Sequence, residues 1–93
     1  MGYDVKVTVE SIEGKCDAGF KVGDQFFIKN QGYMYLEKAG GICIELLGSI
    51  IPHCMAYSTG GKFPWEDQNG RILVSCPDRA NLLTVSLSRV DEV

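Results

Sequence analysis

The fold class is indicated first by an alternating stretch near the start of the chain, YDVKVTVE at residues 3–10. Its tyrosine and three valines occupy every second position, with charged or polar residues between them. A period of two is typical of a β-strand that buries one face. Ile12 departs from this alternation, which predicts a bulge or the end of the strand at that point.

Outward from this stretch, segments 25–30, 71–76 and 83–88 are also predicted to be strands, from their alternating apolar residues. Segment 33–36 is predicted to be a short strand or an irregular apolar arm. The loop at residues 13–24, with three glycines, is too long for a tight hairpin. The sequence therefore predicts a single α+β domain over residues 1–93, with a mostly antiparallel sheet of four or five strands and one helical segment.

The helical segment is predicted over residues 42–57, which have the best helical pattern in the chain. Gly60-Gly61 is predicted to end it. Pro52 lies inside this segment, and an interior proline costs about 3 kcal/mol. We therefore expect either a kink or two short helices, with Pro52 in the first turn of the second.

Composition excludes several classes of function. The 93 residues carry a formal net charge of −3 and no basic run, which argues against nucleic acid or an anionic membrane as the main partner. No apolar run approaches the roughly 20 residues of a membrane helix. The opening residues lack the pattern of a secretory signal, so we expect a cytoplasmic protein.

Four cysteines are the most informative residues, at positions 16, 43, 54 and 76. A reducing cytosol disfavours structural disulfides, which leaves buried thiols, reactive thiols or metal ligands. No Cys-x-x-Cys is present, so any metal site must be assembled by the fold. Cys43 and Cys54 are 11 residues apart, which on one helix is about 16 Å. We therefore expect one of these two to lie outside any shared site.

Cys43 is the better candidate of the pair, because a helix N-terminus favours the thiolate. Cys54 is predicted to be structural. Cys16 lies in a polar, glycine-bearing loop, which disfavours a simple core role. Cys76 ends a predicted strand before a turn, but it also continues an apolar face, so a site role and a core role both stay open.

Five short motifs resemble, in the same order, an uncharacterised family of short prokaryotic proteins of about this length: GKC at 14–16, KVGD at 21–24, GIC at 41–43, GGKFPW at 60–65 and CPDRAN at 76–81. The resemblance implies that Cys16, Cys43 and Cys76 match the cysteines of that family, and that Cys54 has no counterpart. It adds positions and no reaction.

Three cysteines from distant segments suggest a site for a soft metal, with Cys16, Cys43 and Cys76 as both the metal-binding and the cofactor-binding residues. Thiolates select iron–sulfur clusters, zinc or Cu(I). We expect an iron–sulfur cluster first and zinc as the alternative, with one coordination position open. Such a protein would act in electron transfer or at a cofactor site, with a redox protein as a partner.

Two other functions remain open, and the sequence does not decide whether the protein is an enzyme. One is an accessory or interaction protein with structural cysteines and no metal. The other is a thiol-dependent enzyme with Cys43 as its nucleophile, which would need His53 nearby. His53 is the only histidine, and we expect it at the surface or an interface rather than as a fourth ligand.

An apolar cluster at residues 33–36 is more than a small sheet can be expected to bury. Exposed apolar patches mark partner surfaces, so we expect a homo-oligomer. Glu66 and Asp67 could form a pair of catalytic acids, but a solvated loop is favoured. The stretch STGGKF at residues 58–63 lacks the spacing of a phosphate-binding loop.

Overall fold

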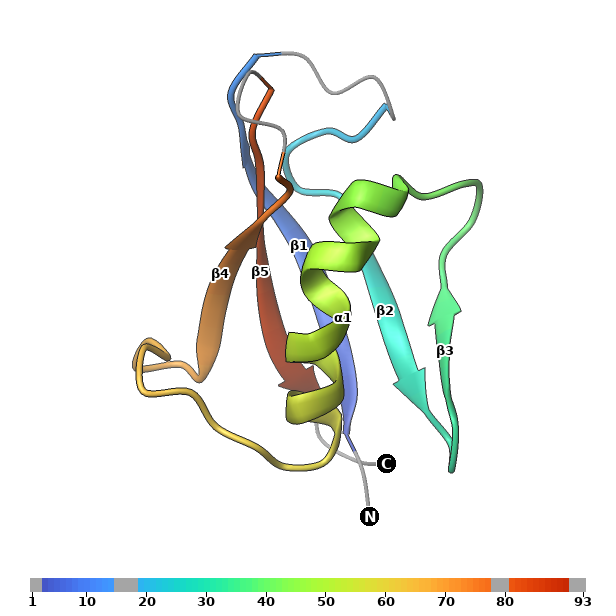
Figure 1. Cartoon of the computed structure of the whole chain (residues 1–93), viewed down its shortest axis with the longest axis vertical. Helices are drawn as coiled ribbons and strands as arrows, with labels where there is room; N and C mark the ends of the chain where they lie inside the picture. The colour runs from blue at the N-terminus through green and yellow to red at the C-terminus, as the bar shows by residue number, and fades with distance from the viewer. Residues whose placement is uncertain (1–2, 15–18, 78–80, 91–93) are drawn as a thin grey trace.

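A computed structural model describes residues 3–14, 19–77 and 81–90. In these residues the chain forms one helix and one five-stranded antiparallel sheet (Figure 1), which confirms the predicted α+β class. The elements are β1 (Asp4–Ile12), β2 (Gln25–Asn30), β3 (Met34–Glu37), α1 (Ile44–Ser58), β4 (Arg71–Ser75) and β5 (Leu83–Val90).

The opening stretch forms the central strand, because the spatial order of the sheet is β3-β2-β1-β5-β4. Every second residue of β1 faces the core, and Val5, Val7 and Val9 are fully or almost fully buried. The pairing of β1 with β5 shifts register between Val9 and Ser11. The predicted irregularity is therefore a bulge, just before Ile12.

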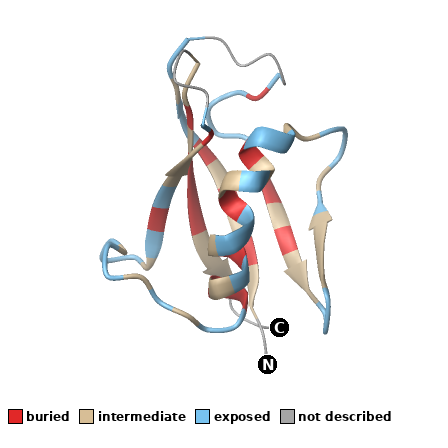
Figure 2. Cartoon of the chain, viewed as in Figure 1, coloured by how far each residue is buried: buried red, intermediate tan, exposed pale blue. Residues whose placement is uncertain are grey.

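Helix α1 lies across one face of the sheet, in front of β1 and β5 in Figure 1, and its main contacts are with β1, β4 and β5. A helix is about 10 Å wide and strands are about 4.8 Å apart, so one helix covers roughly two strands. Figure 2 shows the consequence: buried residues follow the strands beside the helix, while β3 has none.

Pro52 does not divide the helix. The prediction of two short helices is wrong, because α1 runs without interruption from Ile44 to Ser58 with Pro52 inside it. Ile50 and Cys54, on either side of the proline, are fully buried on the same face. Each fully buried side chain of this kind contributes about 2 kcal/mol, which together offset the cost of the proline.

Both ends of α1 match sequence signals. Cys43 is the N-cap, with extended backbone angles, and its carbonyl accepts the Leu47 N–H at 3.0 Å. At the other end, Gly60 has a φ of 87°. Gly60 N–H donates to the Tyr57 carbonyl at 3.1 Å and Gly61 N–H to the Ala56 carbonyl at 2.8 Å, which is a Schellman motif. The predicted glycine stop is where the helix ends.

Candidate functional site: a cysteine-bearing end and an apolar groove

Cys43 lies where the sequence predicts it, at the start of α1. It is partly buried and packs against the hydrophobic core. Its side chain makes no capping hydrogen bond, so the sulfur is not used to hold the helix end.

Cys76 follows β4 directly and is buried. Its N–H donates to the Leu83 carbonyl at 2.9 Å, and its Sγ accepts the Leu83 N–H at 3.3 Å. The Sγ also lies 3.7 Å from the Asn81 carbonyl oxygen, as a thiol donor would. The Cys76 side chain is therefore buried in the core and also hydrogen-bonded to the backbone. Both the core role and the site role that the sequence left open are compatible with this position.

Cys16 lies outside the described residues, so the predicted set of three cysteines is only partly placed. The described residues on either side of it, Gly14 and Gly19, belong to the connection between β1 and β2. Figure 1 shows that the described parts of this connection, the start of α1 and the end of β4 lie towards the same end of the molecule. Within residues 3–14, 19–77 and 81–90, no three His, Cys, Asp or Glu side chains could hold a metal ion.

Cys54 lies in the core, in the second half of α1, with no exposed surface. Burial raises the pKa of its thiol to about 12. This side chain is a neutral, apolar filler at neutral pH, in agreement with the structural role that the sequence favours.

An apolar groove lies between α1 and strands β2 and β3, and Cys54 is one of its lining residues. The groove has a volume of 350 Å³ and its walls are almost entirely apolar. Its lining residues are Ile28, Met34, Tyr35, Leu36, Leu47, Ile51, Cys54 and Met55. Ile51 is 41% exposed and Met55 is 55% exposed. The groove exists because α1 is centred on β1 and β5 and leaves the β3 side of the sheet uncovered.

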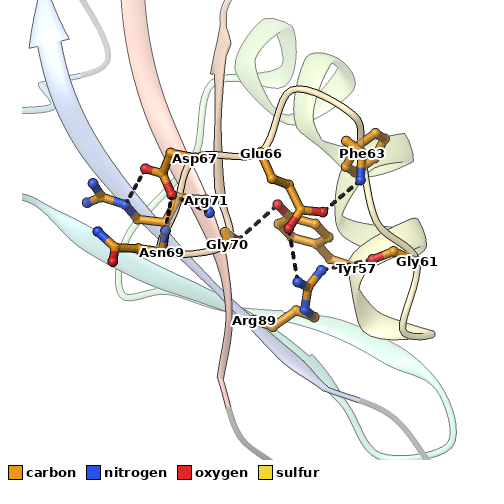
Figure 3. Close-up of polar contacts among 9 residues, drawn as sticks. All are labelled: Tyr57, Gly61, Phe63, Glu66, Asp67, Asn69, Gly70, Arg71 and Arg89. Carbon is orange, nitrogen blue, oxygen red and sulfur yellow. Dashed lines mark hydrogen bonds and ion pairs between the residues drawn. The ribbon is translucent and has the colours of Figure 1, made fainter.

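A polar network holds the opposite flank of α1 (Figure 3). Arg89 donates to the Gly61 carbonyl at 2.8 Å and to Glu66 at 3.1 Å, and its guanidinium lies 4.3 Å from the centre of the Tyr57 ring. Tyr57 in turn donates its hydroxyl to the Gly70 carbonyl at 3.1 Å. These contacts fasten the connection between α1 and β4 to both the helix and β5.

Glu66 differs from the predicted solvated loop. Its side chain is only 12% exposed, and its second oxygen accepts the Phe63 N–H at 2.7 Å. That hydrogen bond, with the Arg89 guanidinium, holds the pKa of Glu66 below its ordinary value. The sequence missed this because Arg89 is 23 residues away from Glu66, and the pairing of β4 with β5 brings the two together.

Asp67 is exposed as expected, but it has a definite structural role. Its carboxylate accepts the Arg71 and Asn69 N–H groups, at 3.0 and 2.8 Å, and its own N–H donates to the Arg71 carbonyl at 2.9 Å. The Arg71 N–H is the main reason that the pKa of Asp67 is lowered. Glu66 and Asp67 therefore both stabilise the loop between α1 and β4.

The aromatic residues of the same loop stack on α1. Phe63 lies with its ring centre 5.4 Å from those of His53 and Tyr57, and Trp65 lies 5.0 Å from Phe63. His53 Nδ1 lies 3.2 Å from the Ser49 carbonyl oxygen, which requires the proton on that nitrogen. The His53 side chain therefore packs against Phe63 of the loop and hydrogen-bonds to the helix backbone.

Comparison with known proteins found no family, no curated protein and no solved structure that matches this chain. Among the described residues, no helix is both long enough and apolar enough to cross a membrane.

Proposed function

We propose that the protein binds a soft metal through thiolates at the end of the molecule where α1 begins and β4 ends. Cys43 and Cys76 are two of the ligands, and Cys16 is the third. An iron–sulfur cluster is the first choice and zinc the alternative, because thiolates select these metals. The observation that carries the proposal is the Cys76 sulfur, which accepts a backbone N–H beside a strand end.

The donor set fits such a group in two ways. Hydrogen bonds from backbone N–H groups to ligand sulfurs are a means by which proteins tune iron–sulfur clusters, and the Leu83 N–H is placed for this. The Cys43 sulfur is partly buried at the start of α1 and makes no capping hydrogen bond there, which leaves it available as a ligand. Bound there, the metal would supply electron transfer or a Lewis-acid position.

The thiol-enzyme alternative has less support. A Cys–His nucleophile would need His53 beside Cys43, but the two are ten residues apart, about 15 Å along α1. His53 Nδ1 is also engaged by the Ser49 carbonyl. The interaction-protein alternative is favoured by a separate observation, the apolar groove beside β3.

The test is metal and acid-labile sulfide analysis, with a visible absorption spectrum, on the full chain purified without oxygen. We expect bound iron with sulfide, or zinc. Single Cys→Ser changes at positions 16, 43 and 76 should lower metal content sharply. Cys54→Ala is the matched control and should retain the metal, because Cys54 lies in the core.

A metal-free wild-type protein would contradict the proposal. Equal loss of metal in Cys54→Ala and in the other variants, with all of them folded by circular dichroism, would also contradict it, because the site would then not be the one named.

A further inference from the structure

The two edge strands of the sheet, β3 and β4, leave different backbone groups free. On β2, the Asn30 N–H donates to Asp4, towards β1, while the Gln31 N–H donates to the Tyr33 carbonyl, towards β3. Hydrogen bonds of antiparallel strands alternate in direction along each strand. The even-numbered residues of β2 therefore bond to β1, and the odd-numbered residues bond to β3.

This alternation identifies the free groups of β3. The register pairs Lys29 with Tyr35 and Phe27 with Glu37, so the backbone groups of Tyr35 and Glu37 are used by β2. The N–H and C=O groups of Met34 and Leu36 point the other way, out of the sheet. No described residue hydrogen-bonds to them.

At the other edge, a loop occupies the corresponding groups at the start of β4. The Cys76 N–H donates to Leu83, so the even-numbered residues of β4 bond to β5 and the odd-numbered ones point outward. Asp67 accepts the outward N–H of Arg71 and donates to its carbonyl. The loop therefore hinders strand addition at the start of β4, where Arg71 lies, while the backbone groups of Leu73 and Ser75 also point outward.

The free edge of β3 also borders the apolar groove. Met34 and Leu36 form one wall of the groove, and the exposed Ile51 and Met55 of α1 form the other. A strand added to β3 would place its side chains about 4.8 Å further out, on the open side of the groove and near Ile51 and Met55. One event would thus satisfy the backbone of β3 and cover the groove.

We propose that a second copy of this chain adds its own β3 to this edge, antiparallel and with a twofold axis at Tyr35. In that register Met34 of one copy and Leu36 of the other form hydrogen-bonded pairs, on both sides of the axis. Their side chains meet on the groove side of the extended sheet. Tyr35 faces the same residue of the second copy as a non-hydrogen-bonded pair.

The charges of β3 suit self-pairing. Residues 33–36 carry no charge, and the register sets Glu37 opposite Tyr33, so the two Glu37 carboxylates lie at opposite ends of the paired strands. The strand contains no proline, no bulge and no central lysine, which are the usual devices against edge pairing. Tyr33 is 68% exposed, so its side chain is accessible to Glu37 of the second copy.

Sedimentation of the full chain tests the proposal. We expect a mass twice the 10.2 kDa of one chain. Leu36→Glu places a charge in the interface and should return the mass to one chain. Leu73→Glu, at a 64% exposed position on the opposite edge, is the matched control and should leave the dimer intact.

Cross-linking tests the register without disturbing the groove wall formed by Met34 and Leu36. Tyr35→Cys should form an intermolecular disulfide on mild oxidation, because directly opposed residues of a non-hydrogen-bonded pair are close enough for one. Tyr33→Cys should not, because position 33 faces Glu37.

A wild-type chain that stays monomeric at millimolar concentration would overturn the proposal, whether or not it binds an apolar peptide in the groove. Cross-linking that is equally fast at positions 33 and 35, or a folded Leu36→Glu variant that remains a dimer, would overturn it as well. Neither experiment depends on metal binding, so failure here is distinguishable from failure of the proposed function.

Discussion

The two flanks of α1 meet the sheet differently. Towards β4 and β5, Tyr57 and the connection at residues 61–70 are fastened by Arg89 and Glu66 (Figure 3). Towards β3, the same helix presents Ile51 and Met55 to an apolar groove. A single 15-residue helix on five strands leaves part of the sheet uncovered. In this chain a loop covers the side of β4, and the side of β3 stays open to solvent.

The largest difference in unfolding free energy should be found between the truncations of two neighbouring isoleucines, Ile50 and Ile51. Ile50 is fully buried, so Ile50→Ala removes core contacts and leaves a cavity, which should cost about 3 to 4 kcal/mol of unfolding free energy. Ile51→Ala, at a 41% exposed position, should cost about 1 kcal/mol or less in the monomer.

Urea unfolding at low protein concentration measures both values. Equal losses for the two variants would mean that the groove side is as tightly packed as the core side. If the loss of unfolding free energy in Ile51→Ala grows with protein concentration, Ile51 lies in the proposed dimer interface.

The next effect concerns the polar fastening. Arg89→Ala removes a charged hydrogen bond to the Gly61 carbonyl, together with the contact over Tyr57, and should destabilise the protein by about 2 kcal/mol. Arg71→Ala is the control, since its ion pair with Asp67 is exposed and should contribute clearly less.

Hydrogen exchange of the amides at residues 61–70 would show the cause of that loss. We expect faster exchange there in Arg89→Ala and little change in β2 and β3. Uniform acceleration over the whole sheet would show that Arg89 stabilises the fold in general and does not specifically fasten the loop.

The smallest effect is that of a single hydroxyl. Tyr57→Phe removes the hydrogen bond to the Gly70 carbonyl and should cost about 1 kcal/mol at neutral pH. Burial raises the pKa of Tyr57 to about 12, above the ordinary value of about 10. Because the folded state holds this proton more tightly, the contribution of Tyr57 is complete below about pH 10 and is lost as the pH rises towards 12.

The stability difference between wild type and Tyr57→Phe should therefore shrink between pH 10 and pH 12, as urea unfolding at several pH values would show. A difference that stays constant over that range would mean that the Tyr57 hydroxyl ionises equally in both states.

Local sequence patterns were enough to predict the central strand and the end of the helix. The alternation of residues 3–10 identifies the central strand, and the glycine pair at 60–61 marks the end of the helix. Each depends on one segment with one period or one backbone preference. The same local reasoning was wrong in predicting two short helices at Pro52. Burial of Ile50 and Cys54 outweighs the local cost of the proline, so the helix continues through it.

The candidate site could be predicted only in part. The start of a helix at Cys43 follows from the glycines before it, and the core position of Cys54 follows from helical spacing. The hydrogen bond that the Cys76 sulfur accepts from Leu83 depends on the turn between β4 and β5, which has no sequence period. The set of Cys16, Cys43 and Cys76 therefore stays a prediction for metal analysis to test.

Most of the strands, the end of the helix, the mostly antiparallel class and the buried face of the central strand could be predicted from periodicity and from glycine conformations over a few residues. Which flank of α1 is closed depends on the packing of distant segments. The partners Arg89 and Glu66 are far apart in the chain, and the groove between α1 and β3 depends on where a single helix comes to rest on a wider sheet. Such features are set by contacts between distant segments, to which no local pattern is sensitive.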